Sequence, residues 1–307
     1  MDPDVDLIST EIIQSFLNGF VPGSTIKSIR LLAGSYSNYT HLLEYQTDDG
    51  VQQQIVLRRY NPSNGTPTEK ANLEFNTLAW LHSKGLPVAK PLYLDLDGSV
   101  LGSPGFAMSF VPGQSVVWPD YPPNDPTGWA IKVGKMLARI HSTPCEPYPK
   151  FLHDNNELAL WFLRSGKIPD YIRNDPDGLA IWEAILDHMP DFKGVKKSLI
   201  HLDYWAGNLL WDGDEICLVV DWEEAGYGEP AIDVAYCLMD MILVGEPHAA
   251  EAFLDTYESM IGEKVEHLAF WELAAAIRPI HQPLGWIDQS PFKERFRRFV
   301  TTALSEV

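Results

Sequence analysis

The segment His201-Leu-Asp-Tyr-Trp-Ala-Gly-Asn208, followed by Asp221-Trp-Glu223, contains the residues that decide the fold. Between the two segments lie an apolar run, an Asp-Gly turn and a second apolar run. Two apolar runs joined by such a turn are typical of a β-hairpin. Pairing the strands outward from the turn carries Asp221 back beside the first segment. The sequence therefore predicts that the polar side chains of Asp203, Asn208 and Asp221 converge.

These three side chains suit phosphoryl transfer. A nucleoside triphosphate arrives with Mg²⁺, which prefers oxygen ligands and takes only a few from protein, and Asn208 and Asp221 are the candidate ligands. The reaction also needs a carboxylate that orients the acceptor hydroxyl and accepts its proton, and Asp203 is the candidate. The order His, any residue, Asp, four residues, Asn, with a later Asp at a strand end, matches the kinase catalytic-loop pattern. Each residue alone is better explained by a turn cap, a strand end or a buried histidine, so the prediction rests on their succession.

On these motifs the chain resembles the aminoglycoside phosphotransferase and choline kinase family. The resemblance implies an α+β, two-lobed protein-kinase-like fold, with an N-terminal antiparallel sheet plus helix and a larger, mainly helical C-terminal lobe. It implies that Asp203 is the catalytic base, that Asn208 and Asp221 are metal ligands, and that His201 organises the loop. One departure is Leu202, where many relatives have Gly.

We expect a nucleotide-binding lobe over residues 1–110 and a catalytic, acceptor-binding lobe over residues 111–307. Alternating side chains predict antiparallel strands over Ile26 to Leu32, Thr40 to Tyr45 and Gln54 to Tyr60. From residue 128 to the C-terminus helical patterns dominate.

Two parts of the first lobe are expected to contact the nucleotide. The turn after the first strand carries Ser35, Ser37 and Asn38 as donors to the triphosphate, although an ordinary hairpin turn is the alternative. On the third strand Val56 and Arg58 share one face, because side chains alternate with a period of two. We expect Val56 to meet adenine and Arg58 the phosphates, with Arg59 as the alternative phosphate-binding residue.

A helix is predicted from Thr66, its N-cap, to about Lys84, with Pro67 in the first turn and Glu69 completing a capping box. Glu74 lies on the inward edge of this helix, where it can pair with Arg58 as the equivalent residues do in kinases. A solvated helix-edge charge is the alternative.

A Pro-Gly turn at residues 112–113 predicts the connection between the lobes. The backbone of Met108, Ser109 and Phe110 is expected to bind adenine there, although an apolar strand ending at such a turn also occurs without any nucleotide.

Composition agrees with a soluble enzyme. The 307 residues carry a formal net charge of -19, which argues against nucleic acid or an anionic membrane surface as partner, because phosphate binding needs excess Lys and Arg. A cationic acceptor becomes more plausible. Three scattered cysteines give no disulfide framework or zinc site, and the absence of a leader pattern or long apolar run predicts a cytoplasmic protein without a membrane span.

The sequence indicates the residues that bind the phosphate acceptor less clearly. Glu223 and Glu224 follow the expected metal ligand and could bind a cationic group or cap the next turn. Asp233 is expected to stabilise a helix N-terminus. Further candidates for a pocket wall, for whose aromatic members core packing is the alternative, are Trp271, Glu272, His281, Trp286 and Asp288.

We therefore expect an ATP- and Mg²⁺-dependent phosphotransferase acting on a hydroxyl of a small molecule, with GTP as an alternative donor. The acceptor could be an antibiotic such as an aminoglycoside, or a metabolite alcohol of the choline, homoserine or sugar type. A catalytically silent, kinase-like nucleotide-binding protein is the second class. A true protein kinase is a third, disfavoured by the missing Ala-Pro-Glu signature. The sequence does not indicate an oligomeric state.

Overall fold

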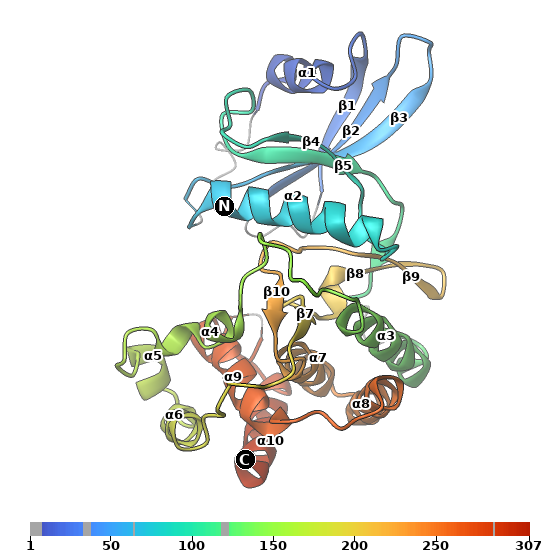
Figure 1. Ribbon diagram of the computed structural model, residues 1–307. Helices are drawn as coiled ribbons and strands as arrows, with labels where there is room; N and C mark the ends of the chain where they lie inside the picture. Colours follow the sequence, from blue (N-terminus) through green and yellow to red (C-terminus); the bar gives the residue numbers. More distant parts are fainter. Residues whose placement is uncertain (1–7, 33–37, 64, 118–122, 285) are drawn as a thin grey trace. The chain divides into compact units, whose positions relative to one another are not determined.

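The computed structural model describes residues 8–32, 38–63, 65–117, 123–284 and 286–307. By its internal contacts the chain divides into two compact units (Figure 1). Unit 1 contains Met1–Pro112 and Val220–Glu224, and unit 2 contains Gly113–Val219 and Ala225–Val307. The segment Val220–Glu224, which includes the expected metal ligand Asp221, is therefore packed with residues far from it in the sequence.

Unit 1 is built on one five-stranded sheet in the order β1-β2-β3-β5-β4, with every neighbouring pair antiparallel. The three predicted strands are present within two residues of their expected bounds. The strands are β1 (Thr25–Leu31), β2 (Tyr39–Gln46), β3 (Gln52–Arg59), β4 (Pro91–Asp95) and β5 (Gly105–Ser109).

In the described part of unit 1, helices α1 (Thr10–Asn18) and α2 (Pro67–Ser83) cover opposite faces of this sheet (Figure 1). Helix α1 packs Ile13 and Phe16 against Leu43 and Ile55. These two strand residues pair with each other, so their side chains lie on the same face of the sheet. Helix α2 lies on the other face and carries Glu74 to β3. The predicted helix is confirmed, but its capping box is wrong.

The capping box fails for a conformational reason. Thr66 has ψ 76°, outside the extended region in which an N-cap side chain reaches back to the helix, and it makes no capping hydrogen bond.

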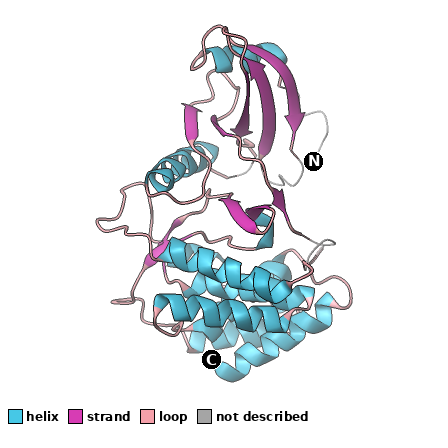
Figure 2. Ribbon diagram, turned by 90° about the vertical axis from the view of Figure 1, so that its right-hand side faces the viewer, coloured by secondary structure: helices cyan, strands magenta, loops and turns pink. Residues whose placement is uncertain are grey.

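Unit 2 is mainly helical (Figure 2). Its strands are β6 (Gln114–Ser115), β7 (Ser198–Ile200), β8 (Leu209–Asp212), β9 (Glu215–Val219) and β10 (Gly226–Gly228). Its helices are α3 (Pro126–His141), α4 (Asn156–Ala159), α5 (Asp170–Arg173), α6 (Gly178–Asp187), α7 (Ala231–Val244), α8 (Pro247–Ile261), α9 (Leu268–His281) and α10 (Phe292–Glu306), with 3₁₀ turns at Trp161–Leu163 and Ala206–Asn208.

The predicted hairpin is confirmed. Strands β8 and β9 are antiparallel, Leu209 pairs with Val219, and Gly213 turns the chain with φ 57°, a conformation that glycine adopts without steric cost.

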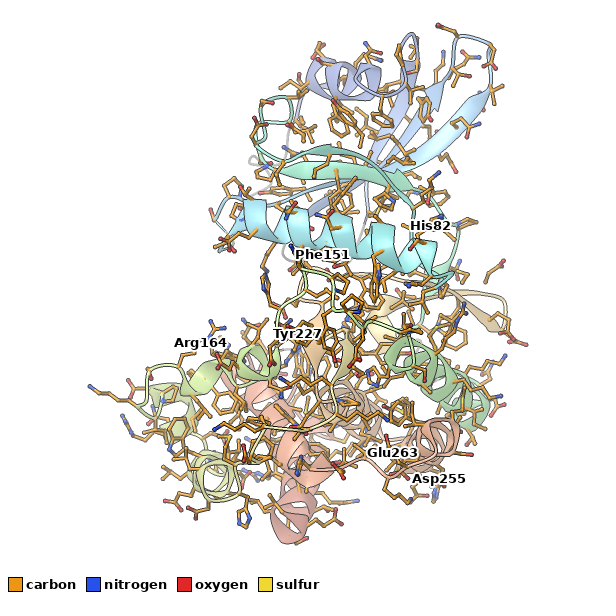
Figure 3. The ribbon with its side chains drawn as sticks, viewed as in Figure 1. His82, Phe151, Arg164, Tyr227, Asp255 and Glu263 are labelled. Carbon is orange, nitrogen blue, oxygen red and sulfur yellow. The ribbon has the colours of Figure 1, made fainter. Side chains whose placement is uncertain are left out.

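The core of unit 2 lies between α7, α9 and α10. Nearly every side chain of α7 is buried, as expected for a helix that is apolar all round. The short strand β10 pairs with β7, and its central residue Tyr227 is labelled in Figure 3. The Tyr227 ring stacks on Tyr148, with the ring centroids 4.0 Å apart. Within the described residues, every helix is too short or too polar to cross a lipid bilayer.

Candidate active site

The loop after β7 brings Asp203 and Asn208 together in unit 2. The Asn208 side-chain amide donates to Asp203 Oδ2 at 2.9 Å and to the Asp203 carbonyl at 2.8 Å. The other carboxylate oxygen, Oδ1, accepts from Arg278 of α9 at 2.9 Å. The Asp203 side chain is 29% exposed, so the candidate base is held at both oxygens and still reaches solvent.

Arg278 is a site residue that the sequence analysis missed. It also donates to the Leu202 carbonyl at 2.6 Å, and its guanidinium lies 4.3 Å from the ring centroid of Tyr236. Such stacking suits a planar cation. The available signal was an arginine directly after the apolar run Leu273–Ile277 of a buried helix, a place where a charge needs a specific partner.

Asp233 anchors the same loop from α7. Its carboxylate accepts the backbone N–H groups of His201 and Leu202, both at 2.7 Å, and contacts His141 Nε2 at 3.1 Å. The fully buried His201 ring accepts from the Asp203 backbone N–H at 3.3 Å through Nδ1. The role of His201 as a loop-organising residue stays a prediction, whereas Asp233 lies in the first turn of its helix as expected.

A second acid adjoins the loop. The pKa of Asp240 is raised to about 7, mainly because burial disfavours the charged carboxylate. A hydrogen bond from the Ala206 backbone lowers this pKa, and the Asp203 charge raises it further. One carboxylate oxygen of Asp240 is buried without a hydrogen-bond partner in the described part of the chain. This region of unit 2 therefore combines a partly exposed carboxylate, a second acid with one buried oxygen, and one guanidinium.

In unit 1 the sheet register places Val56 and Arg58 as predicted, on one face. Val56 lies between Leu42 and Met108 across three strands, and Arg58 lies in the next row, between Thr40 and Phe106. Paired residues of an antiparallel sheet point to the same side. An apolar row suited to a planar base thus adjoins a row that carries a cation.

Arg58 is surrounded by carboxylates. Its Nε lies 3.1 Å from Glu74, and its Nη2 lies 2.5 Å from Asp221 and 3.0 Å from Glu223. Arg59 instead lies over the Tyr39 ring at 5.2 Å. Of the two arginines that the sequence left open, Arg58 is the one paired with Glu74.

Glu74 is almost fully buried and also accepts a hydrogen bond from the Tyr60 hydroxyl. Burial raises its pKa, the Arg58 charge opposes this, and the charges of Asp221 and Glu223 add to it. Oxygen atoms of Glu74, Asp221 and Glu223 all lie within 4.8 Å of one another. Three hard oxygen donors this close suit a cation such as Mg²⁺.

Both carboxylate oxygens of Glu223 accept hydrogen bonds from side chains of unit 1. Its Oε2 accepts from Asn38 at 2.6 Å and from Arg58 at 3.0 Å, and its Oε1 accepts from Lys70 at 3.0 Å. The predicted nucleotide contact Asn38 therefore holds a carboxylate. Burial has the largest effect on the pKa of Lys70 and lowers it, but the nearby Glu223 carboxylate raises it, and the net shift is upward. Glu224 also lies close enough to raise the pKa of Lys70, by a smaller amount.

The remaining predicted residues are placed as follows. Ser109 donates its N–H to the Lys90 carbonyl at 2.8 Å, and its hydroxyl accepts from Lys90 N–H at 2.9 Å. Phe110 lines an open pocket of about 610 Å³ at the end of the sheet. Ser35 and Ser37 lie outside the described residues. Asn208 belongs to unit 2 and Asp221 to unit 1.

Two suggested wall residues of an acceptor pocket lie in different surroundings. Trp271 is buried and donates to Glu229 at 3.0 Å, which is a core role. Trp286 stacks on Tyr236 at 6.1 Å and so belongs to the group around Arg278.

The comparisons with known proteins agree with this picture. Residues 28–271 match the family model described as APH, the phosphotransferase enzyme family, and the chain belongs to that family. The predicted resemblance and the kinase-like α+β fold are thereby confirmed. The chain is 24% identical over 300 residues to acyl-CoA dehydrogenase family member 10 of Mus musculus, covering 89% of this chain and 26% of that protein. It thus spans about a quarter of the length of that relative.

Two further relatives match over most of their length. A homoserine kinase of Methylobacillus flagellatus is 20% identical, covering 86% of this chain and 80% of that protein. The structure of the amicoumacin kinase hAmiN, in complex with AMP-PNP, Ca²⁺ and Ami, superimposes with a TM-score of 0.65 and 16% identity, covering all of this chain and 97% of that one.

Proposed function

We propose that this protein is an ATP- and Mg²⁺-dependent kinase that transfers the γ-phosphate to a hydroxyl group of a small molecule in the cytoplasm. The observation that carries the proposal is the partly exposed carboxylate of Asp203, held by Asn208 and Arg278 in a loop with the kinase spacing. Membership of the phosphotransferase family supports it. The intact Asp203, Asn208 and Asp221 disfavour the catalytically silent alternative.

In this proposal residues 1–110 form the nucleotide-binding lobe and residues 111–307 the catalytic and acceptor-binding lobe. Adenine lies on the apolar row of Leu42, Val56 and Met108. The Ser109 N–H is already donated to the Lys90 carbonyl, so of the expected hinge residues Phe110 is the one whose backbone would bind the edge of adenine. Arg58, fixed by Glu74, faces the phosphates. The related amicoumacin kinase was solved with AMP-PNP, which supports an adenine nucleotide.

Asp221 and Asn208 would hold the metal ion, and Glu74 and Glu223 lie near enough to Asp221 to share it. When bound, the ion neutralises charge on the phosphates. Asp203 orients the acceptor hydroxyl and accepts its proton as transfer proceeds. Arg278 keeps that carboxylate in one orientation by binding Oδ1 while it also binds the loop backbone.

We propose the phosphate acceptor only as a class of compound, a small molecule with a hydroxyl group. The homoserine kinase relative covers most of both chains, which favours a metabolite alcohol, and the amicoumacin kinase favours an antibiotic. The prediction that Glu223 and Glu224 bind a cationic acceptor group stays a prediction, since in the structure Glu223 already binds Arg58 and Lys70. The net charge of -19 disfavours nucleic acid as a partner.

The test is phosphate-mass addition to pooled hydroxyl compounds, among them aminoglycosides, macrolides, choline, sugars and homoserine, in the presence of Mg²⁺-ATP. We expect a modified compound with the native protein, and at least a hundredfold lower turnover, about 3 kcal/mol, with Asp203→Asn. Asp221→Asn should weaken the metal-dependent part of nucleotide binding. Near-native turnover of Asp203→Asn, or failure of the native protein to bind Mg²⁺-ATP, would contradict the proposal.

A further inference from the structure

Unit 1 contains a second, half-buried cation beside Arg58. Lys70 closes the first turn of α2, and its Nζ donates to Glu223 Oε1 at 3.0 Å, while Arg58 binds Oε2 of the same carboxylate at 3.0 Å. The two oxygens of one side chain thus separate the two cations. A phosphate group presents a similar pair of anionic oxygens.

The position of Lys70 is unfavourable for an ordinary helix residue. A positive charge near a helix N-terminus opposes the helix dipole, and the side chain is only 24% exposed. Its ammonium is nevertheless held 3.0 Å from the Glu223 carboxylate. A lysine kept charged in such a place points to a specific anion.

Glu223 uses only part of what Lys70 offers. The ammonium has three N–H donors, of which Glu223 takes one in the described part of the chain. Arg58 is the more enclosed cation, with a side chain only 9% exposed and contacts to Glu74, Asp221 and Glu223. Of the two cations, Lys70 is therefore the more accessible to a ligand.

The charges around these residues favour a polyanion only if both cations take part. Arg58 and Lys70 face the carboxylates of Glu74, Asp221 and Glu223, so the group has excess negative charge by itself. Loss of the Lys70 charge would enlarge that excess by one unit, so the lysine reduces the repulsion of phosphates.

We propose that Lys70 is a second phosphate-binding residue, which contacts the terminal phosphates of the nucleotide beyond Arg58. The proposal rests on the function proposed above. In this proposal the nucleotide begins with adenine on the apolar row at Val56 and passes Arg58, two residues further along β3. Its terminal phosphates then reach Lys70 at the start of α2. Lys70 then contributes to affinity for the phosphates and leaves affinity for the nucleoside unchanged.

Calorimetric titration of the full chain with ATP, ADP and adenosine, each with Mg²⁺, tests this. We expect Lys70→Met to weaken ATP and ADP binding about tenfold, the value of one charge-assisted hydrogen bond, with adenosine binding unchanged. Lys70→Arg should restore most of the lost affinity. Lys84→Met is the matched control, because Lys84 is an exposed lysine that caps the other end of α2, and it should bind all three ligands like the native protein.

Two results would overturn the inference. One is native ATP affinity in Lys70→Met, and the other is an equal loss for ATP and adenosine, with or without a lowered melting temperature, which would make Lys70 only a structural partner of Glu223. Failure of the native protein to bind ATP would instead count against the proposed function, and the inference would fall with it.

Discussion

At the scale of single residues, Leu202 combines two conflicting requirements. Its φ is 70°, in the left-handed region that costs about 1–2 kcal/mol for a residue with a Cβ atom. Its side chain is 2% exposed within the core of unit 2. The backbone conformation favours glycine, whereas the packing favours leucine. Asp233 and Arg278 hold the strained peptide by its N–H and its C=O.

Replacing Leu202 separates the two terms. Leu202→Ala should lose about 3 kcal/mol of stability through the cavity that it leaves, while the strain remains. Leu202→Gly loses the same packing but relieves the strain, so it should be at least as stable as the alanine variant and up to about 1 kcal/mol more stable. Urea unfolding measures both.

Leu199 is the matched control, because it is fully buried in β7 and has no positive φ. There the glycine variant should be less stable than the alanine variant, the usual order. The same order at residue 202 would show that its backbone is not strained.

At the scale of elements, the sequence predicted most of what is local. The alternation in β1, β2 and β3, the Asp-Gly turn of the β8–β9 hairpin and the extent of α2 all depend on neighbours within a few residues, and all are confirmed. The capping box failed because the backbone angles of Thr66 outweigh its residue type.

The side-chain pairs of the site were harder to predict. Arg58 with Glu74 could be inferred because the kinase pattern names both. The pairs Arg278 with Asp203 and Lys70 with Glu223 are 75 and 153 residues apart in the chain. No periodicity or spacing links residues at such separations, since the contact is made only when helices and strands pack.

Helix α7 holds the start of the candidate catalytic loop through the side chain of Asp233, which accepts two backbone N–H groups there. Asp233→Asn keeps the shape of the side chain, but it replaces one acceptor oxygen by an NH₂ group. That donor would face a backbone N–H of the loop or His141, so a hydrogen bond would be lost. We expect a loss of about 3 kcal/mol in the free energy of unfolding and a larger loss of turnover than of nucleotide affinity. Thermal unfolding and steady-state kinetics measure these, with the exposed Asp187→Asn at the end of α6 as control. Native stability in Asp233→Asn would mean that the loop holds its own conformation.

At the scale of the whole molecule, acidity extends into the core. The chain carries a net charge of -19, and some of its carboxyl groups are buried in α7 and α9. Burial raises the pKa of Glu272 to about 7, with the Glu306 charge adding to it, and the pKa of Asp240 is raised to about 7 in the same direction. These groups should make the folded protein prefer mildly acidic solution.

The sign follows from proton binding. Between pH about 4.5, where Glu272 ionises in the unfolded chain, and pH about 7, the folded state keeps a proton that the unfolded state has lost, so stability falls as pH rises. Glu272→Gln removes this proton linkage. Relative to the native protein, the variant should gain up to about 3 kcal/mol between pH 4 and pH 7.5, as measured by urea unfolding at a series of pH values. The exposed Glu266→Gln should leave the pH profile unchanged. A constant difference between Glu272→Gln and the native protein across this range would mean that Glu272 ionises in the core as readily as it does in water.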